Sequence, residues 1–515
     1  MTAYGSGRHG RRGPIRRRWV TPPVPLPDDN REGQVRKEML PDSIGLLMTG
    51  RRLRTHVGGG LYCAAMGNEL ALGQTRAGIL VDGQEGTPYL ACTLAYENGQ
   101  GSLLEVPYVP HDEQYATVAP WLRGSTSPPV TMVFQDAEGI VTLNGVRWRG
   151  DRGADVSVGR LDARLTIFGR ARELADEYAV KTLISRIDGL HEFAGFESIS
   201  STHDRPDGQW RTTVTVHAKD SLRVEHAGIS FTIRATVPAT ASTVEFTALA
   251  DAVIETTTDD GATVDEHVVA QWPIRALLTL AFGVPLFWRD HKLLDEQFPT
   301  WMLSGAAHEP VPVPLILRRT ASDHEQDKVQ WRDLATSVFR LSDLGIDGLA
   351  RWLDFYADPL FRRAVEPAVE VLNGGAGNFL EPRLTLTMFA LDALGHYLDQ
   401  ERKQKVPLRD QIERCLAVPG VEWSKLGERA DLAQAMAHVN NDLKHPDRGR
   451  RPDGVELSLA ARLGLVIFRL QIAHLLELDR SLIQRFCALN PFINAIDAFE
   501  QNGVRISEGR FTRTA

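Results

Sequence analysis

The residues best suited to chemistry lie together in residues 438–446, where the sequence reads HVNNDLKHP. If this stretch is helical, His438, Asn441 and His445 fall on one face, because they are spaced three and four residues apart. Pro446 is expected to end the helix, because a proline pushes the preceding residue out of the α conformation. His445 would then stand at a helix end, where its imidazole can exchange a proton with a bound molecule near neutral pH.

A basic loop follows at once and supplies cations beside that imidazole. The positively charged side chains of this segment are Lys444, Arg448, Arg450 and Arg451. Guanidinium groups bind phosphate through paired hydrogen bonds and offset negative charge. This is the only stretch of the sequence in which proton-handling, polar and cationic side chains converge within so few residues. If the protein is an enzyme, we expect its catalytic site here.

The same residues also have ordinary structural interpretations. A histidine near a helix C-terminus is favoured by the helix dipole, by about 0.3–1 kcal/mol when it is exposed. Asn440 and Asn441 can bond the local backbone, and the basic loop can simply be solvated. Spacing alone leaves both interpretations open.

Composition restricts the class of protein. The 515 residues carry a formal net charge of −8, which excludes a wholly basic nucleic-acid binder but not a local basic site. The four cysteines form no CxxC pair, which is typical of a reduced cytoplasmic protein without structural zinc. No carboxylate set has the spacing of a metal nuclease, so neither a metal nor another cofactor is expected. No apolar run approaches the length of a membrane span, and no membrane partner is expected.

The elements that position these residues can be read from the periodicity. Residues 1–38 hold six arginines in the first twenty positions and then a proline-rich piece, and a disordered tail is expected there. Such a tail could grip nucleic acid, but a solvated leader is the simpler interpretation. Residues 39–310 are expected to form a β-rich domain, a sandwich or barrel-like fold. In this part Phe231, Ile233 and Ala235 alternate with polar residues, as half-buried strands do.

From residue 325 onward the apolar residues recur at the spacing of a helix. The clearest apolar stripe is Leu384, Met388, Leu391, Leu394 and Leu398. Further helices are expected at 348–356, 361–372, 429–445 and 457–478, and short connections favour an antiparallel bundle over residues 325–500. Residues 501–515 are expected to be a C-terminal tail. The predicted fold class is therefore α+β, with a β-rich domain followed by an all-α bundle.

Two parts of the sequence resemble a known family. The strand-like block 139–143, the segment 163–169 and the segment 183–193 resemble the N-terminal β domain of ApeA-type anti-phage proteins. In that family a strand ends in an Asp-Gly-Leu turn and an aromatic residue follows. Asp188, Gly189, Leu190 and Phe193 occupy those places here, with phenylalanine where tryptophan is expected.

The helical half resembles a HEPN domain, whose signature is an arginine, a polar residue, three further residues and a histidine at the end of a helix. The resemblance implies a homodimer in which paired signature helices line a cleft and cleave RNA without metal. His445 and Asn441 match the signature, but Asn440 stands in the place of the arginine. The basic residues of the following loop, or a facing protomer, are expected to replace the missing cation, and His438 is a second proton carrier in this interpretation.

The predicted function is anti-phage defence through a HEPN-type endoribonuclease that depends on His445. The expected partners are RNA, with tRNA as one candidate, a second copy of the chain bound through the helical half, and a phage-derived trigger sensed by the β half. The alternative is a catalytically inactive HEPN domain that binds RNA, or a sensor or scaffold without RNA contact; Asn440 favours this alternative.

Overall fold

The structure is a computed structural model of the chain, and it describes residues 68–513 apart from 84–86, 98, 154, 173–177, 206–209, 219, 242–245, 300–307 and 401–405. The chain divides into two compact units, residues 1–58 and residues 59–515. The first unit, and with it the tail predicted for residues 1–38, lies outside the described residues. All of the described residues belong to the second unit.

The first group of strands builds a small core of its own. These elements are β1 (Thr75–Val81), β2 (Leu90–Glu97), β3 (Gly101–Tyr108), α1 (Ala119–Leu122), β4 (Thr131–Gln135), β5 (Ile140–Asn144), β6 (Arg147–Gly153), β7 (Ser157–Ala163) and β8 (Leu165–Ile167). Alternate residues of β2 point inward, so that Leu90, Cys92 and Leu94 are buried. Side chains of β1 to β5, β7 and α1 form one hydrophobic cluster, whereas Leu165 and Ile167 of β8 belong to the larger cluster of the second group of strands.

A second group of strands continues the same sheet around a long helix. It comprises β9 (Ala179–Ile187), α2 (Leu190–Ala194), β12 (Ser221–His226), β13 (Ile229–Thr236), β16 (Asp251–Thr263), α3 (Val264–Phe282), β17 (Trp288–Leu294), β18 (Val313–Leu317) and the 3-10 segment η3 (Arg318–Glu325). Two separate strand pairs, β10 (Ile199–Asp204) with β11 (Arg211–Val216) and β14 (Ala239–Ala241) with β15 (Phe246–Ala248), complete this part.

Within the described residues the strands of the two groups, without these two separate pairs, form one antiparallel sheet of 14 strands. Their order is β12-β13-β16-β9-β17-β18-β8-β5-β4-β1-β2-β3-β7-β6. The predicted alternation is confirmed in β13, where Phe231, Ile233 and Ala235 are buried. Helix α3 was not anticipated from the sequence. It begins with a capping box, in which Thr263 and Glu266 exchange side-chain and backbone bonds, and it packs on β9 and β16.

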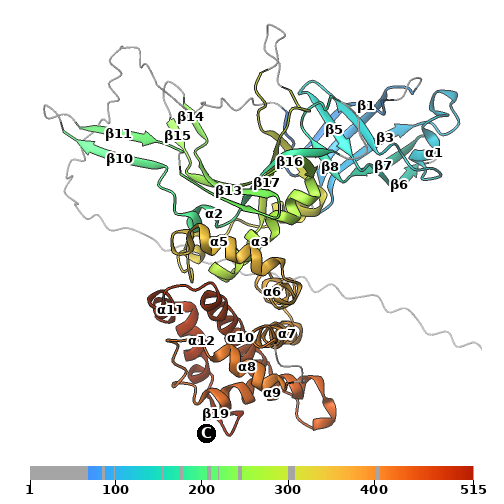
Figure 1. The fold of residues 1–515 in the computed structure, drawn as a ribbon. Helices are drawn as coiled ribbons and strands as arrows, with labels where there is room; N and C mark the ends of the chain where they lie inside the picture. The colour runs from blue at the N-terminus through green and yellow to red at the C-terminus, as the bar shows by residue number, and fades with distance from the viewer. Residues whose placement is uncertain are drawn as a thin grey trace, which may run out of the picture. The chain divides into compact units, whose positions relative to one another are not determined.

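The C-terminal half is helical, as predicted, and the α+β fold class is confirmed (Figure 1). Its elements are α4 (Trp331–Leu334), α5 (Leu341–Ala357), α6 (Pro359–Leu372), α7 (Leu380–Tyr397), α8 (Leu408–Leu416), α9 (Arg429–Lys444), η4 (Pro446–Arg448), α10 (Gly454–Leu475), α11 (Arg480–Cys487) and α12 (Asn490–Gln501). Helix α7 packs on α6, α8 and α10, and its predicted apolar stripe is buried at Leu384, Met388, Leu391 and Leu394.

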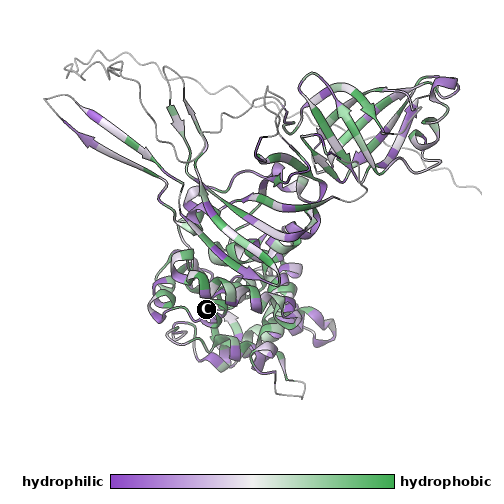
Figure 2. Cartoon of the chain, turned by 45° about the horizontal axis from the view of Figure 1, so that its top comes forward, coloured by the Kyte–Doolittle hydropathy of each residue, from purple (hydrophilic) through white to green (hydrophobic). Residues whose placement is uncertain are grey.

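The helices share a single core with the second group of strands. Helix α5 contacts β12, and α6 contacts α3, so the two halves meet through packed side chains. Figure 2 shows hydrophilic and hydrophobic bands alternating within individual strands and helices, as expected for elements with one buried face. Among the described helices, none combines the length and the apolar character that crossing a lipid bilayer requires.

The end of the chain differs from the expected tail. Residues 504–513 form a hairpin of β19 (Val504–Ser507) and β20 (Arg510–Arg513), whose strands contact α9. Its turn residues Glu508 and Gly509 both have positive φ, as the type I′ two-residue hairpin turn requires. Val504 and Phe511 are buried, and Phe511 meets the ring of Phe499 on α12 edge-on at 5.2 Å. The hairpin is therefore part of the helical half.

Candidate functional site

Helix α9 ends at Lys444 and leaves His445 at its C-terminal cap, as the sequence predicts. One side of the helix is buried and carries small and apolar residues such as Leu432, Ala433 and Met436. The backbone of His445 is no longer helical (φ −121°, ψ 84°), although its N–H still donates to the carbonyl of Asn441 at 2.9 Å. The side chain of His445 is exposed. The imidazole is thus accessible to a molecule that binds at this end of the helix.

The two asparagines before it differ in accessibility. Asn440, which occupies the place of the signature arginine, is only 2% exposed, and its Oδ1 is a buried atom without a hydrogen-bond partner. Asn441 is half-buried. Asn440 continues the buried side of the helix at the spacing Leu432, Met436, Asn440. In this conformation Asn440 cannot contact a phosphate in solvent.

His438 bonds to the hairpin rather than to solvent. Its Nδ1 donates to the carbonyl oxygen of Gly509 at 2.8 Å, and its Nε2 accepts from Nε2 of Gln434 at 2.6 Å. Both ring nitrogens are therefore occupied. This geometry gives His438 a positioning role between α9 and the hairpin, and it argues against the predicted role of second proton carrier.

Three arginines gather around one buried carboxylate, that of Asp442. Nη1 of Arg448 and Nη1 of Arg450 lie 3.6 Å from the carboxylate oxygens of Asp442, and Nη1 of Arg510 lies 3.9 Å away. Arg450 also pairs with Glu456 near the start of α10. The side chain of Asp442 is 4% exposed, whereas the three guanidinium-bearing side chains are partly exposed. The cations, not the carboxylate, are therefore accessible to solvent.

The remaining predicted cations are arranged more loosely. Arg451 lies 3.6 Å from Glu381 and is largely exposed. Lys444 is exposed and has no ion pair with the described part of the chain. The structure therefore places His445, Lys444 and the loop arginines at one end of α9, while Asn440 and His438 are directed into the protein.

Sequence reasoning did not identify Asp442, Arg510 or the carbonyl of Gly509. A signal for Asp442 was present, because Ala435, Val439 and Asp442 are spaced four and three apart and are all buried. A signal for the hairpin was also present in the alternation of Val504, Ile506 and the glycine turn. The contact between Arg510 and Asp442 joins distant parts of the sequence and leaves no local pattern.

The start of α10 forms a further side of the site. Asp453 caps the helix by accepting from the backbone N–H groups of Val455 and Glu456, both at 2.9 Å, and Glu456 completes the capping box. Nη2 of Arg513 in β20 lies 2.6 Å from Asp453 Oδ2. The backbone N–H of Glu456 and, after it, Arg513 hold the pKa of the Asp453 carboxyl below its usual value. The hairpin is thus fixed to both α9 and α10.

A second polar cluster lies at the Asp-Gly-Leu turn between β9 and α2. Arg289 pairs in a bidentate manner with Asp188, and Arg275 lies 3.0 Å from Asp323. Burial raises the pKa of the Asp323 carboxyl despite its ion pair with Arg275. Gly189 has φ +75°, and a Cβ there would lie 3.0 Å from Phe282. We interpret this turn as a structural joint, because its charges are paired and largely buried.

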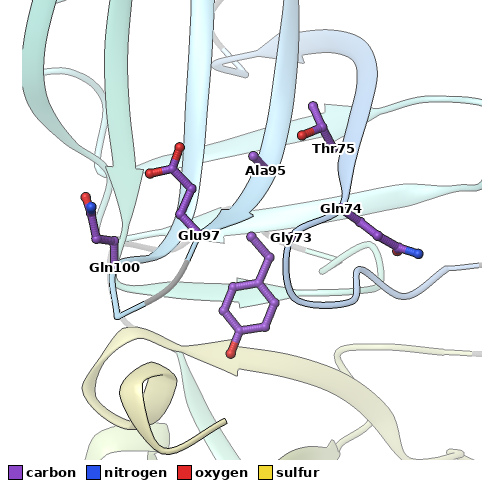
Figure 3. A pocket seen from close by; sticks show the side chains of 7 residues that line it. Gly73, Gln74, Thr75, Ala95, Glu97 and Gln100 are labelled. Carbon is purple, nitrogen blue, oxygen red and sulfur yellow. The ribbon is translucent and has the colours of Figure 1, made fainter. Parts of the chain in front are cut away.

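Two of the cavities in the described part of the chain lie elsewhere. One, of about 410 Å³, lies at the start of β1 and the end of β2 and is lined by Gly73, Gln74, Thr75, Ala95, Tyr96, Glu97 and Gln100. Figure 3 shows the side chains that line it. The other, of about 660 Å³, lies where β13, α3, α5, α6 and α7 meet and includes Trp272 and Arg319. Neither is lined by a residue of the site at the end of α9. In the described ranges, no group of three or more histidine, cysteine or acidic side chains is arranged to hold a metal ion.

Comparison with known proteins gives one match. The family model described as ApeA N-terminal domain 1 matches residues 82–352, a range that begins directly after β1 and ends within α5. The match includes the Asp-Gly-Leu turn and its buried charges. No curated protein and no solved structure matches the chain.

Proposed function

The chain belongs to the family defined by ApeA N-terminal domain 1, which points to anti-phage defence, and from this premise we propose that its helical half is a metal-independent endoribonuclease that cleaves RNA. The observation that carries the proposal is the exposed imidazole of His445 at the end of α9, beside three arginines that reach solvent. An imidazole and a group of guanidiniums are the side chains that RNA cleavage without metal needs.

In the proposed reaction His445 takes the proton from a ribose 2′-hydroxyl, and the resulting oxygen attacks the adjacent phosphate. The guanidinium groups bind the phosphate oxygens and offset the charge that develops in the transition state. The bond from phosphorus to the 5′-oxygen of the next nucleotide breaks, which leaves a 2′,3′-cyclic phosphate, and a second proton carrier is needed to protonate the leaving 5′-oxygen. Because both ring nitrogens of His438 are occupied, we assign that role to His445 of a second copy, in a homodimer formed through the helical half.

The test uses the purified full-length chain, labelled total RNA and an excess of EDTA. The wild type is expected to cleave, and His445→Ala is expected to lose cleavage while it keeps RNA affinity. His111→Ala is the matched control, because His111 is also exposed but lies in the β half. Loss of wild-type cleavage on chelation, or full activity of His445→Ala, would overturn the mechanism.

A second function, RNA binding without cleavage, is favoured by the buried Asn440 in the place of the signature arginine. It predicts that the wild type binds labelled RNA but releases no fragments under any condition. A sensor or scaffold would show neither property. In cells, plating efficiency of phage on strains that carry the wild type or His445→Ala separates these possibilities, since only the nuclease mechanism requires the imidazole for protection.

A further inference from the structure

We propose that Arg448, Arg450 and Arg510 together form a binding site for a phosphate group of single-stranded RNA, with Asp442 as the residue that positions them. The inference rests on the proposed function, in that RNA is the ligand, but it assigns the contact to residues beyond the imidazole. It also makes the hairpin β19–β20 one wall of the site. The arginines come from three separate segments, η4, the following loop and β20.

The geometry supports a site for an external anion. All three guanidiniums approach the same carboxylate at 3.6–3.9 Å, beyond ordinary hydrogen-bond distance. Oδ2 of Asp442 is correspondingly a buried oxygen without a hydrogen-bond partner. Each guanidinium has five N–H donors, so Asp442 orients the three groups while most of their donors remain available.

The charges favour an anion as well. Asp442 is 4% exposed, whereas the side chains of Arg448, Arg450 and Arg510 are 45%, 36% and 50% exposed. Glu456 is the other carboxylate paired with this group, and its side chain is 9% exposed. Three cations are thus opposed by two buried carboxylates. A phosphodiester oxygen that enters from solvent therefore reaches the exposed guanidiniums before either of these two carboxylates.

Arg510 is held in place by its hairpin. Gly509, next to it, accepts the bond from Nδ1 of His438, and a Cβ at Gly509 would lie 2.5 Å from Cγ of Gln434. On the other side of Arg510, Phe511 is buried, and Arg513 is paired with Asp453. The backbone that carries Arg510 is therefore fixed on α9, which reduces the conformational entropy lost when it binds a phosphate.

The test measures affinity by fluorescence anisotropy with a labelled single-stranded RNA of about 20 nucleotides. All variants carry His445→Ala, so that cleavage of the RNA does not affect the measured affinity. Arg510→Gln is expected to lower the affinity by about threefold to tenfold and to reduce the slope of log K against log salt by about 0.7. Arg505→Gln is the matched control, because Arg505 is exposed on the other strand of the hairpin and has no ion pair with the described residues.

Asp442→Asn tests the positioning role separately. Removing a negative charge should strengthen RNA binding if Asp442 only neutralises the arginines. If Asp442 positions them, its loss weakens binding by about threefold or more even though the net charge becomes more positive. Stronger binding by this variant would overturn the positioning role. Equal affinities of Arg510→Gln and Arg505→Gln would overturn the phosphate site.

The outcomes also separate this inference from the proposed function. If the wild type cleaves RNA and His445→Ala does not, but Arg510→Gln binds like its control, only the phosphate site is wrong. If the His445→Ala parent binds no RNA and the wild type cleaves none, the proposed function itself is wrong. Arg510→Lys keeps the charge and should recover part of the affinity, and an unchanged melting temperature for each variant excludes misfolding as the cause.

Discussion

Arg469 of α10 donates from Nε to the carbonyl oxygen of Leu280 at 2.7 Å, and its Nη2 donates to the carbonyl of Ala281 at 2.8 Å. Both acceptors lie in the last turn of α3, where carbonyls lack an N–H partner within the helix, and the carbonyl of Ala281 also accepts from the backbone N–H of Val338 at 2.9 Å. Burial lowers the pKa of the Arg469 guanidinium to about 10. A cation from the helical half thus caps the long helix of the β half, at the negative end of its dipole.

Arg469→Met is expected to lower the free energy of unfolding by about 3 kcal/mol, because two buried carbonyls lose charged donors. Arg462→Met is the control, since Arg462 lies on the same helix with its side chain exposed, and a change within about 0.5 kcal/mol is expected there. Denaturant unfolding followed by circular dichroism measures both. Similar losses in the two variants would mean that the cap contributes little.

Gly395 allows α7 and α8 to approach closely. A Cβ at this position would lie 2.5 Å from the carbonyl oxygen of Gln411, a backbone atom that cannot move alone. Gly395→Ala is therefore expected to destabilise the protein by about 1–3 kcal/mol, although alanine favours helix more than glycine does. At Gly454 the nearest atom is a side-chain carbon of Leu380 at 3.5 Å, so Gly454→Ala is the neutral comparison. Thermal unfolding of the two variants distinguishes backbone crowding from propensity.

Much of the fold could be predicted because periodicity is a local property. The stripe from Leu384 to Leu394 defines the buried side of α7, and alternation in 229–236 defines β13. Likewise, Pro446 fixes the end of α9 and places His445 at the cap without any tertiary information. Helix α3 was harder to predict, because it follows β16 directly and is apolar on nearly all sides.

The candidate site was only partly predictable, because its geometry depends on contacts between distant segments. Arg448 and Arg450 could be recognised as cations, but nothing local indicates that both converge on Asp442. An aspartate near a helix end is ordinarily solvated. Arg510 of the hairpin also approaches Asp442, and the polar composition of residues 501–515 had led to the prediction of a tail there.

His438 and His445 are expected to respond differently to replacement by alanine. His438→Ala removes the bond to Gly509, at a cost of about 1 kcal/mol to the docking of the hairpin. Amide hydrogen exchange in residues 504–513 should become faster in this variant. His445→Ala should leave that exchange unchanged, because its side chain is exposed and makes no hydrogen bond with the described residues. If His438→Ala instead abolished RNA cleavage without any change in exchange, the proton-carrier role predicted from the sequence would be restored.

The buried histidines of the β half predict that acid destabilises the protein. His291 is fully buried, with Nδ1 2.8 Å from Ser185 Oγ and Nε2 2.9 Å from Thr320 Oγ1. Burial, helped by neighbouring His324, lowers the pKa of His291 from its ordinary value to about 3. Because the unfolded chain binds a proton near pH 6.5 and the folded chain does not, stability contributed by the neutral ring is lost as pH falls from about 6.5 toward 3.

The loss attributable to His291 is expected to approach about 1.4 kcal/mol per pH unit in that window and to vanish above about pH 7.5. Denaturant unfolding at several pH values between about 7.5 and 5 measures the slope for the wild type and for His291→Gln. The variant is expected to be less stable at neutral pH, since two buried hydrogen bonds are disturbed, but its slope should be shallower. His111→Gln, an exposed histidine of the same half, should keep the wild-type slope. A slope in His291→Gln as steep as that of the wild type would show that His291 does not stay neutral in the folded protein.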